Sequence, residues 1–372
     1  MEHKALPLHA HLASLPVYQP GRPLEEVARE LGIPFDRVTK LASNENPLGP
    51  SPKAVMAMKK AAESAHLYPD GNGYYLKEKL AALHQLEPSQ IILSNGSNEL
   101  IEWIGHVLLD NRSNIVVSQY CFAIYPIVAA MFGAQSKIVP ATDFGHDLEG
   151  MLQAVDASTK AVFVANPNNP TGTLVNAEAL RTFVSQIPSH VLVVLDEAYV
   201  EYLEDTADFV EVVRSGAIPN LLLMRTFSKI YGLAGCRLGY GMGPTSLVAA
   251  MEKVRQPFNA NSMAQSGALA ALDDQEHLER SRQVNREGLT QLQEGFLAMG
   301  LSFVPSSANF VLVKVGQGKE VFQALQRQGI IVRPMEGYQL PSWVRVSVGT
   351  HAQNQRFLEK LSGVLEGSAQ GC

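Results

Sequence analysis

The sequence predicts an α/β protein with a mainly parallel central sheet and a second, smaller α+β lobe. Short apolar runs rich in β-branched residues alternate with longer segments of helical periodicity. Such continuous runs are typical of parallel strands covered on both faces, and their alternation with helices indicates βαβ units. The chain has 372 residues, more than a single core usually supports, so two lobes are expected.

The main sheet is predicted from apolar runs that carry few polar residues. These candidate strands are 91–93, 115–117, 161–164, 191–195 and 221–223. Helix candidates lie between them. The segment 100–109 is one, because its apolar side chains recur at helical spacing, at Leu100, Ile104, Val107 and Leu108.

The smaller lobe is predicted from a change of pattern after Gln265. Here the chain is expected to form long helices over 266–299, a strand at 309–313, a helix at 319–328 and a strand at 343–348. The first 45 residues are rich in proline and contain one amphipathic piece, 24–31, so they are expected to pack as an arm. The predicted division is a large domain, 46–260, and a unit made of 1–45 and 261–372.

Composition restricts the classes of function. The net charge is −6 and no dense Lys/Arg block occurs, so nucleic-acid binding is not expected and small-molecule substrates are. We expect no membrane span or signal peptide, since no apolar stretch is long enough. The three cysteines, Cys121, Cys236 and Cys372, are too few and too widely spaced for a disulfide framework or a metal site. A cytoplasmic protein without a bound metal is expected.

Two ionisable residues follow neighbouring candidate strands. Asp196 comes directly after 191–195, and Lys229 follows the next strand, so both are expected at the sheet edge where open α/β sheets bind ligands. A buried Asp needs a positive partner to stay charged, and a protonated pyridine nitrogen would be one. Taken alone, Asp196 is more simply a helix N-cap and Lys229 a solvated surface charge.

Three further segments have side chains suited to binding an anion or a ring oxygen. Residues 94–99 (SNGSNE) precede a helix, whose N-terminal amides can bind phosphate. Arg237 lies in a glycine-bearing loop that lets the backbone approach an anion. In the turn 166–172 (NPNNPTG), an Asn amide could donate to a phenolate-like oxygen. Each has a simpler alternative: helix capping for 94–99, an ion pair for Arg237 and a rigid turn for 166–172.

Read in order, these segments resemble the fold-type I pyridoxal-phosphate aminotransferases, and specifically the histidinol-phosphate aminotransferase family. The motifs that support the cofactor are NPTG at 169–172, DEAY at 196–199 and SK at 228–229 with the trailing Arg237. The resemblance covers nearly the whole chain through YQPG at 18–21, KLASNENP at 40–47, YPDG at 68–71 and VRVSVGT at 344–350. It implies pyridoxal 5′-phosphate as cofactor.

The resemblance implies a role for each residue around the cofactor ring. Lys229 would bear the cofactor as a Schiff base and then move the proton of the reaction, and Asp196 would keep the pyridine nitrogen protonated. Asn169 and Tyr199 look like the partners of the ring hydroxyl. Phe122 matches the aromatic residue stacked over the ring, where the family often has tyrosine.

The cofactor phosphate would be held by Ser97, Asn98, Ser228 and Arg237. Tyr68 resembles the residue that reaches this phosphate from the neighbouring subunit, which implies a homodimer with shared active sites. Cys236 departs from the Leu or Ile common beside this arginine, and the sequence leaves open whether it or Cys121 is reactive.

Substrate binding is implied for four residues. Arg345 matches the arginine that clamps the α-carboxylate of glutamate, and Arg333 with Tyr18 of the partner's arm would help it accept a phosphate ester. Asn46, within the motif at 40–47, is placed with these substrate-binding residues. Arg333 and Tyr18 could instead only pair and pack at the dimer interface.

The expected reaction is amino-group exchange between glutamate/2-oxoglutarate and histidinol phosphate/imidazole-acetol phosphate, as in histidine biosynthesis. An aromatic amino-acid aminotransferase is the nearest alternative, and a decarboxylase of a phosphorylated amino acid would use the same lysine. A non-catalytic sensor of this fold joined to a DNA-binding module is a different class, and the acidic net charge argues against it.

Overall fold

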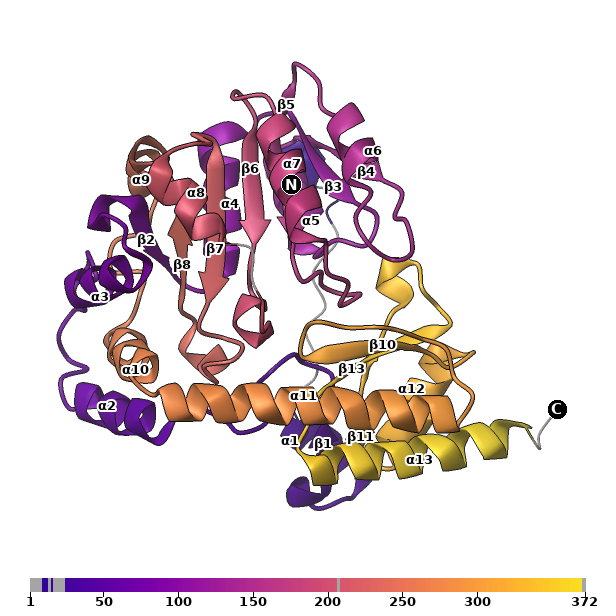
Figure 1. Ribbon diagram of the computed structural model, residues 1–372. Coiled ribbons are helices and arrows are strands. Elements are labelled where there is room, and N and C mark those ends of the chain that lie inside the picture. The colour runs from indigo at the N-terminus through magenta and orange to yellow at the C-terminus, as the bar shows by residue number, and fades with distance from the viewer. Residues whose placement is uncertain (1–8, 13–14, 16–23, 206–207, 370–372) are drawn as a thin grey trace, which may run out of the picture.

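The larger of two main sheets has seven strands and is mainly parallel (Figure 1). The computed structural model describes residues 9–12, 15, 24–205 and 208–369. β8 runs antiparallel to the other six strands of this sheet, which are parallel to one another. In spatial order the strands are β2 (Ile91–Ser94), β8 (Gly239–Met242), β7 (Leu221–Thr226), β6 (Leu192–Asp196), β5 (Thr159–Ala165), β3 (Asn114–Ser118) and β4 (Gln135–Val139). The predicted α/β class is confirmed.

Alternate side chains of each central strand enter two separate cores. In β5, Val162 and Val164 face one core while Ala161 and Phe163 face the other, as the two-residue period of a strand requires. The first face is covered by α3 (Tyr74–His84), α6 (Leu148–Gln153), α7 (Ala177–Gln186), α8 (Phe209–Ser215) and α10 (Ser262–Leu272). The second face is covered by α4 (Ser97–Leu108), α5 (Ile124–Met131) and α9 (Thr245–Glu252).

All five predicted strands are present, and two more were missed. β4 was missed because it is an edge strand whose first three residues are polar and whose fourth, Ile138, is exposed. β8 was missed because it contains two glycines, which are unfavourable in strands. A Cβ at Gly239 would lie 2.6 Å from the amide nitrogen of Ser97. Glycine at this position therefore lets β8 lie against the start of α4.

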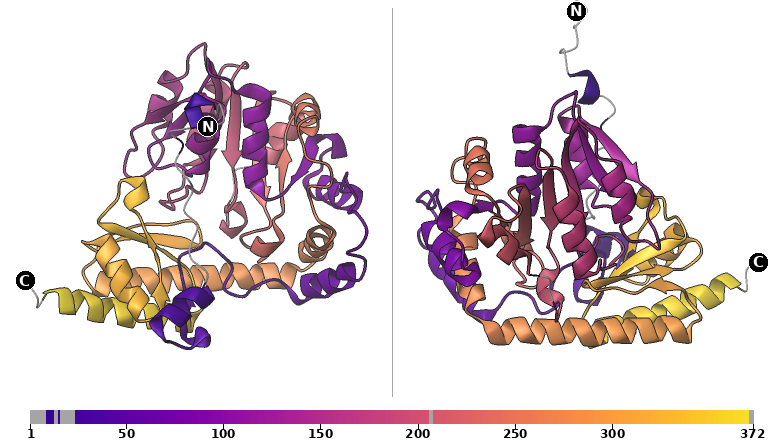
Figure 2. Two further views of the ribbon diagram at one scale, coloured as in Figure 1. Left: turned by 180° about the vertical axis from the view of Figure 1, so that it is seen from behind. Right: turned by 45° about the horizontal axis from the view of Figure 1, so that its top comes forward.

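The smaller sheet is antiparallel and lies to one side of the larger one (Figures 1 and 2). Its order is β12 (Arg333–Pro334), β13 (Trp343–Ser347), β10 (Phe310–Lys314) and β9 (Phe303–Val304). Its core is closed by α11 (Gln275–Ala298), α12 (Gly318–Arg327) and α13 (His351–Ala369). These elements match the predicted α+β lobe, except that the helical stretch begins at 262 and is interrupted between α10 and α11.

The N-terminal segment connects the two sheets. α1 (Leu24–Leu31) has the predicted bounds, β1 (Thr39–Lys40) pairs in parallel with β11 (Ile330–Ile331), and α2 (Pro52–Ala62) packs on α10. α11 extends beneath both sheets in Figure 1. The domain boundary near 260 stays a prediction. The remaining short helices are η1 (Ala10–Leu12), η2 (Phe35–Arg37), η3 (Pro88–Gln90), η4 (Val200–Tyr202), η5 (Ala234–Cys236) and η6 (Glu336–Tyr338).

None of the helices in the part of the chain that the structure describes is long and apolar enough to cross a bilayer. Within the same residues, no group of three or more His, Cys, Asp or Glu side chains is arranged to hold a metal ion.

Candidate active site

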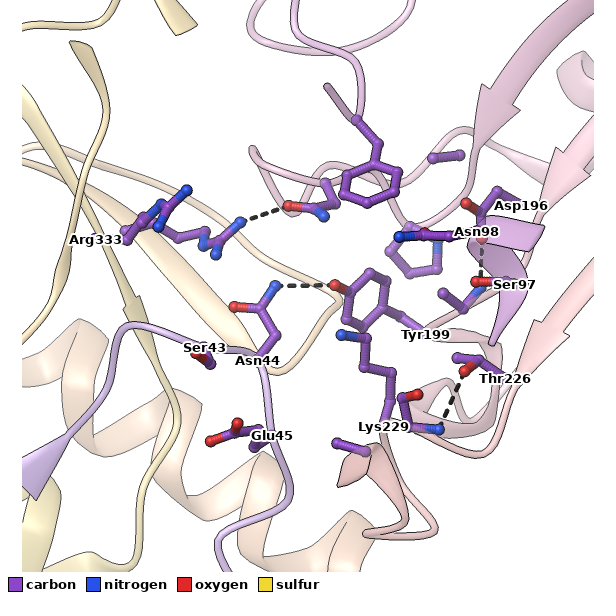
Figure 3. A pocket seen from close by; sticks show the side chains of 18 of the residues that line it. Ser43, Asn44, Glu45, Ser97, Asn98, Asp196, Tyr199, Thr226, Lys229 and Arg333 are labelled. Atoms are coloured by element: carbon purple, nitrogen blue, oxygen red, sulfur yellow. Dashed lines mark hydrogen bonds between the residues drawn. The ribbon is translucent and has the colours of Figure 1, made fainter. Parts of the chain in front are cut away.

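A pocket of about 360 Å³ lies between the carboxyl ends of the central strands and the smaller sheet (Figure 3). Its walls come from the loops after β5, β6 and β7, the start of α4, residues 42–45, and β12 and β13. It brings together most of the predicted site residues: Ser97, Asn98, Phe122, Asn169, Asp196, Tyr199, Ser228, Lys229, Arg237, Arg333 and Arg345.

Three predicted site residues are not among those that line the pocket. The amide of Asn46 donates to the Ile230 carbonyl oxygen at 2.6 Å and to Ser281 Oγ at 2.9 Å, so it links the loop after β7 to α11. Tyr68 is 82% exposed, away from this chain's own pocket. Tyr18 lies outside the described residues.

Asp196 is the last residue of β6 and its carboxylate is buried. Oδ2 accepts a hydrogen bond from Tyr125 Oη at 2.7 Å, and Oδ1 accepts one from the Ala198 amide at 3.1 Å. Burial raises the pKa of Asp196, although both hydrogen bonds and the charge of Lys229 oppose the rise. Asp196 caps no helix. Its buried carboxylate would be stabilised by one more cationic partner.

Lys229 lies in the loop after β7, with its Nζ 5.5 Å from the centroid of the Tyr199 ring. Burial lowers its pKa to about 8, the positive charge of Arg345 adds to this, and Asp196 and Glu45 oppose it. A lysine with a lowered pKa has a larger share of free amine at neutral pH, and the free amine is the form that attacks carbonyl carbons.

This lowered pKa predicts the pH dependence of labelling in the cofactor-free protein. Reductive methylation of Lys229, followed by mass spectrometry, should rise with pH to a midpoint near 8, against about 10.4 for a lysine in a model peptide. Labelling rises with pH because only the deprotonated amine reacts. A midpoint above 10 would show that the pocket does not favour the neutral amine.

The start of α4 and the loop after Lys229 form an anion-binding cradle. Ser97 is the first residue of this 12-residue helix, so its end presents unpaired amides. Gly96 has φ +72°, and a Cβ there would collide with Nη2 of Arg237. Arg237 Nη1 donates to Ser228 Oγ at 3.3 Å and to the Ala234 carbonyl oxygen at 3.0 Å. Glycine at 96 thus lets a guanidinium lie beside the helix start.

Two arginines form the opposite wall. Arg333 on β12 and Arg345 on β13 are paired in the strand register. Arg345 is buried, its Nη1 donates to Asn169 Oδ1 at 2.6 Å, and its guanidinium lies 5.2 Å from the ring centroid of Phe310. Figure 3 shows Arg333 on the opposite side of the pocket from Asp196 and Ser97. The pocket therefore has anion-binding groups at opposite ends. Asp196 lies on the side of Ser97, and Lys229 lies between the two ends.

A family model described as Aminotransferase class I and II matches residues 36–361, most of the chain. The chain belongs to this family. Among curated aminotransferases, histidinol-phosphate aminotransferase 2 of Pseudomonas fluorescens (strain Pf0-1) is 51% identical over 94% of both chains. The histidinol-phosphate aminotransferase of Akkermansia muciniphila is 47% identical over 95% of this chain and 98% of its own.

A solved aminotransferase structure has the same fold over its whole length. The histidinol-phosphate aminotransferase of Sinorhizobium meliloti, in complex with pyridoxal-5′-phosphate, superposes with a TM-score of 0.88 at 28% identity. The comparison covers 98% of this chain and 99% of that one. The fold-type I architecture expected from the sequence motifs is therefore confirmed.

Three residues of this aminotransferase pocket were missed from the sequence. Tyr125 lies on α5 and binds the Asp196 carboxylate, but it stands in an apolar helical pattern that indicates only burial. Asn44 donates to Tyr199 Oη at 2.9 Å and belongs to a motif from which only Asn46 was selected. Tyr338 of η6 lines the substrate side of the pocket, and nothing near it in sequence indicates this.

Neither thiol near the aminotransferase pocket is activated. Burial raises the pKa of Cys121 to about 12 and also raises the pKa of Cys236. The Cys236 thiol donates to Met58 Sδ at 3.3 Å. Because the thiolate is the nucleophile, both cysteines are expected to react slowly at neutral pH.

Proposed function

We propose that the chain is a pyridoxal-5′-phosphate-dependent aminotransferase. It exchanges an amino group between L-glutamate/2-oxoglutarate and histidinol phosphate/imidazole-acetol phosphate in L-histidine biosynthesis. The observation that carries this proposal is the arginine pair, Arg333 and Arg345, in the wall of the same pocket as Lys229, whose pKa is lowered to about 8. The relatives named histidinol-phosphate aminotransferase, 51% and 47% identical to this chain, support the same substrate.

The residues present fit the cofactor. The pKa of the buried Asp196 carboxylate is raised, and among the residues that the structure describes no cation is in hydrogen-bonding contact with it. This place suits a protonated pyridine nitrogen. The cradle at Gly96 and Arg237 suits a phosphate. When bound, pyridoxal 5′-phosphate supplies a conjugated ring that accepts the electrons left on the substrate Cα after its proton is removed.

Each residue then has a defined task. Lys229 holds the cofactor and, through its amine, moves the proton at the substrate Cα. Asp196 keeps a proton on the pyridine nitrogen. Ser97, Asn98, Ser228 and Arg237 bind the phosphate, Asn169 and Tyr199 bind the ring hydroxyl, and Phe122 covers the ring.

The two arginines bind the substrate's anion. Glutamate has an α-carboxylate, while histidinol phosphate lacks one and carries a phosphate ester. A guanidinium binds either group with two parallel hydrogen bonds, so one pair of arginines can serve both half-reactions in turn. Tyr18 of the partner's arm remains a proposed third contact.

The reaction itself is tested by amino transfer from glutamate to two acceptors, imidazole-acetol phosphate and phenylpyruvate, at matched concentrations. We expect a kcat/KM at least about 30-fold higher for the phosphate acceptor. Its dianionic phosphate can bind both arginines, whereas the single carboxylate of phenylpyruvate carries one negative charge, and a lost charged hydrogen bond costs about 2 kcal/mol. A preference for phenylpyruvate would make the chain an aromatic amino-acid aminotransferase. Release of carbon dioxide in place of amino transfer would indicate a decarboxylase.

Arg345→Ala should lower kcat/KM for glutamate and for histidinol phosphate together, by about 30-fold each, because both anions lose a charged hydrogen-bond donor. Arg345→Lys keeps the charge without the two-pronged geometry and should recover only part of the loss. Arg327→Ala, an exposed arginine at the end of α12, is the control and should change neither value. A loss confined to one substrate would contradict shared recognition.

We propose further that the enzyme is a homodimer in the cytoplasm. Large apolar side chains are exposed on α2, on α3 and in the segment between them, namely Met56, Leu67, Tyr68, Tyr74 and Tyr75, and Phe258 is exposed as well. Tyr68 stacks on Phe258 with ring centroids 4.7 Å apart. Several large apolar side chains exposed together are typical of a protein interface, and the same face presents Tyr68 for the pocket of a second copy.

Leu67→Asp should convert the dimer to a monomer in analytical ultracentrifugation, because it places a charge within the proposed interface. Ile138→Asp is a matched control, since Ile138 on β4 is 60% exposed and Leu67 is 61% exposed. It should leave the dimer intact. A wild-type monomer, or dissociation by the control alone, would exclude this face as the interface.

A further inference from the structure

A buried chain of three hydrogen-bonding side chains links the smaller sheet to the pocket. Ser347 Oγ on β13 donates to Asn44 Oδ1 at 3.0 Å, and Asn44 Nδ2 donates to Tyr199 Oη at 2.9 Å. All three residues are buried, with at most 5% of each exposed. The second of these bonds is drawn in Figure 3, where Lys229 reaches up beside the Tyr199 ring.

The direction of these bonds determines where the Tyr199 proton can point. A tyrosine hydroxyl has one proton to donate, and an amide NH₂ group can only donate. Because Asn44 Nδ2 already donates to Tyr199 Oη, the hydroxyl proton cannot point at Asn44. Ser347 holds the amide in this orientation by donating to its oxygen. The Tyr199 proton is therefore left for the pocket.

The surroundings of Tyr199 keep its hydroxyl protonated. Burial raises the pKa of Tyr199 to about 12, while the charge of Arg345 and the hydrogen bond from Asn44 act in the opposite direction. Tyr199 therefore remains a donor throughout the working pH range. The titratable or charged groups that surround it are Lys229, Arg345, Asp196, Tyr125 and Tyr202.

We propose that Asn44 is a positioning residue that turns the Tyr199 hydroxyl proton into the pocket, toward the ring oxygen of the cofactor. This inference rests on the proposed function. Ser347 lies two residues after Arg345, so both side chains leave the same face of β13. The strand that carries the anion-binding arginine therefore also sets the hydrogen-bond direction at Tyr199.

The test is a double-mutant cycle on the holoenzyme without substrate. The measured quantity is the midpoint of the pH titration of the bound cofactor's absorbance. A hydrogen-bond donor to the ring oxygen stabilises the deprotonated form of the bound cofactor and so lowers this midpoint. Asn44→Asp offers only acceptors, so it should take the Tyr199 proton and raise the midpoint. The new negative charge of the aspartate also raises the midpoint. The contribution of this charge is measured separately by making Asn44→Asp in a Tyr199→Phe background.

We expect Asn44→Asp to raise the midpoint by about 0.5 to 1 pH unit more in the wild-type background than beside Tyr199→Phe, the amount that one hydrogen bond contributes. Ser347→Ala adds no charge and provides a second test should the Asp variant fail to fold. It should raise the midpoint in the wild-type background and leave it unchanged beside Tyr199→Phe.

Equal shifts in the two backgrounds would overturn the proposal while leaving the proposed function intact. Both the role of Asn44 and the proposed function would be overturned if the wild-type chain binds pyridoxal 5′-phosphate with no pH-dependent absorbance attributable to Lys229.

Discussion

Replacing Lys229 with alanine should reduce amino transfer by at least about 10⁴-fold while the protein stays folded. The variant loses both the amine that holds the cofactor and the base that moves the Cα proton, and loss of a general base alone costs up to about 10⁴-fold. The side chain lies at a pocket, so its removal leaves no closed cavity within either hydrophobic core. Single-turnover kinetics with glutamate, together with circular dichroism, would measure both effects.

The control for this variant is Lys319→Ala, which removes an exposed lysine on α12 and should leave activity unchanged. The absorbance of the cofactor is a second measurement. The band near the edge of the visible range that arises when the cofactor is bound to Lys229 should be absent in Lys229→Ala. Activity close to wild type in Lys229→Ala would rule out the mechanism proposed here.

Asp196→Asn should lower kcat by about 10² to 10³-fold, the cost typical of removing one group that stabilises charge in a transition state. The amide has nearly the same shape as the carboxylate but cannot balance a proton on the pyridine nitrogen. Steady-state kinetics at saturating cofactor would measure the loss. The contacts to Tyr125 and the Ala198 amide can partly persist, so the fold should be kept.

Although Asp196→Asn should lower kcat, it should not lower the stability of the cofactor-free protein. Burial raises the folded-state pKa of Asp196, so the charged carboxylate destabilises the fold at neutral pH, and this cost disappears as pH falls below about 4. Asp196→Asn should therefore melt at the same temperature as wild type or higher at pH 7. A lower melting temperature together with unchanged kcat would assign Asp196 a structural role.

Glu197 provides a matched comparison, because it is the next residue and is also buried. Its Oε2 accepts from Arg225 Nε at 2.8 Å, and it does not line the described pocket. Glu197→Gln should destabilise the protein by about 3 kcal/mol by leaving a buried arginine without its charged partner. Its kcat should change far less than in Asp196→Asn.

The sequence by itself determined five of the seven strands of the main sheet and one edge of the site. Continuous apolar runs located the five strands, and the order of parallel strands placed Asp196, Lys229 and Asn169 at their carboxyl ends. These are local signals, since burial on both faces leaves its pattern within each strand. The motifs then identified the family, because several fixed spacings agreed over the whole chain.

Only the tertiary structure decided which distant side chains meet. Arg345 reaches Asn169 from a strand of the other sheet, Tyr125 binds Asp196 from a helix, and Asn44 is in the pocket wall where Asn46 had been expected. Sequence periodicity reports whether a residue is buried, but not against what. The direction of a buried polar side chain is set by the partners that satisfy its hydrogen bonds, and for these residues the partners lie between 71 and 235 residues away in the chain.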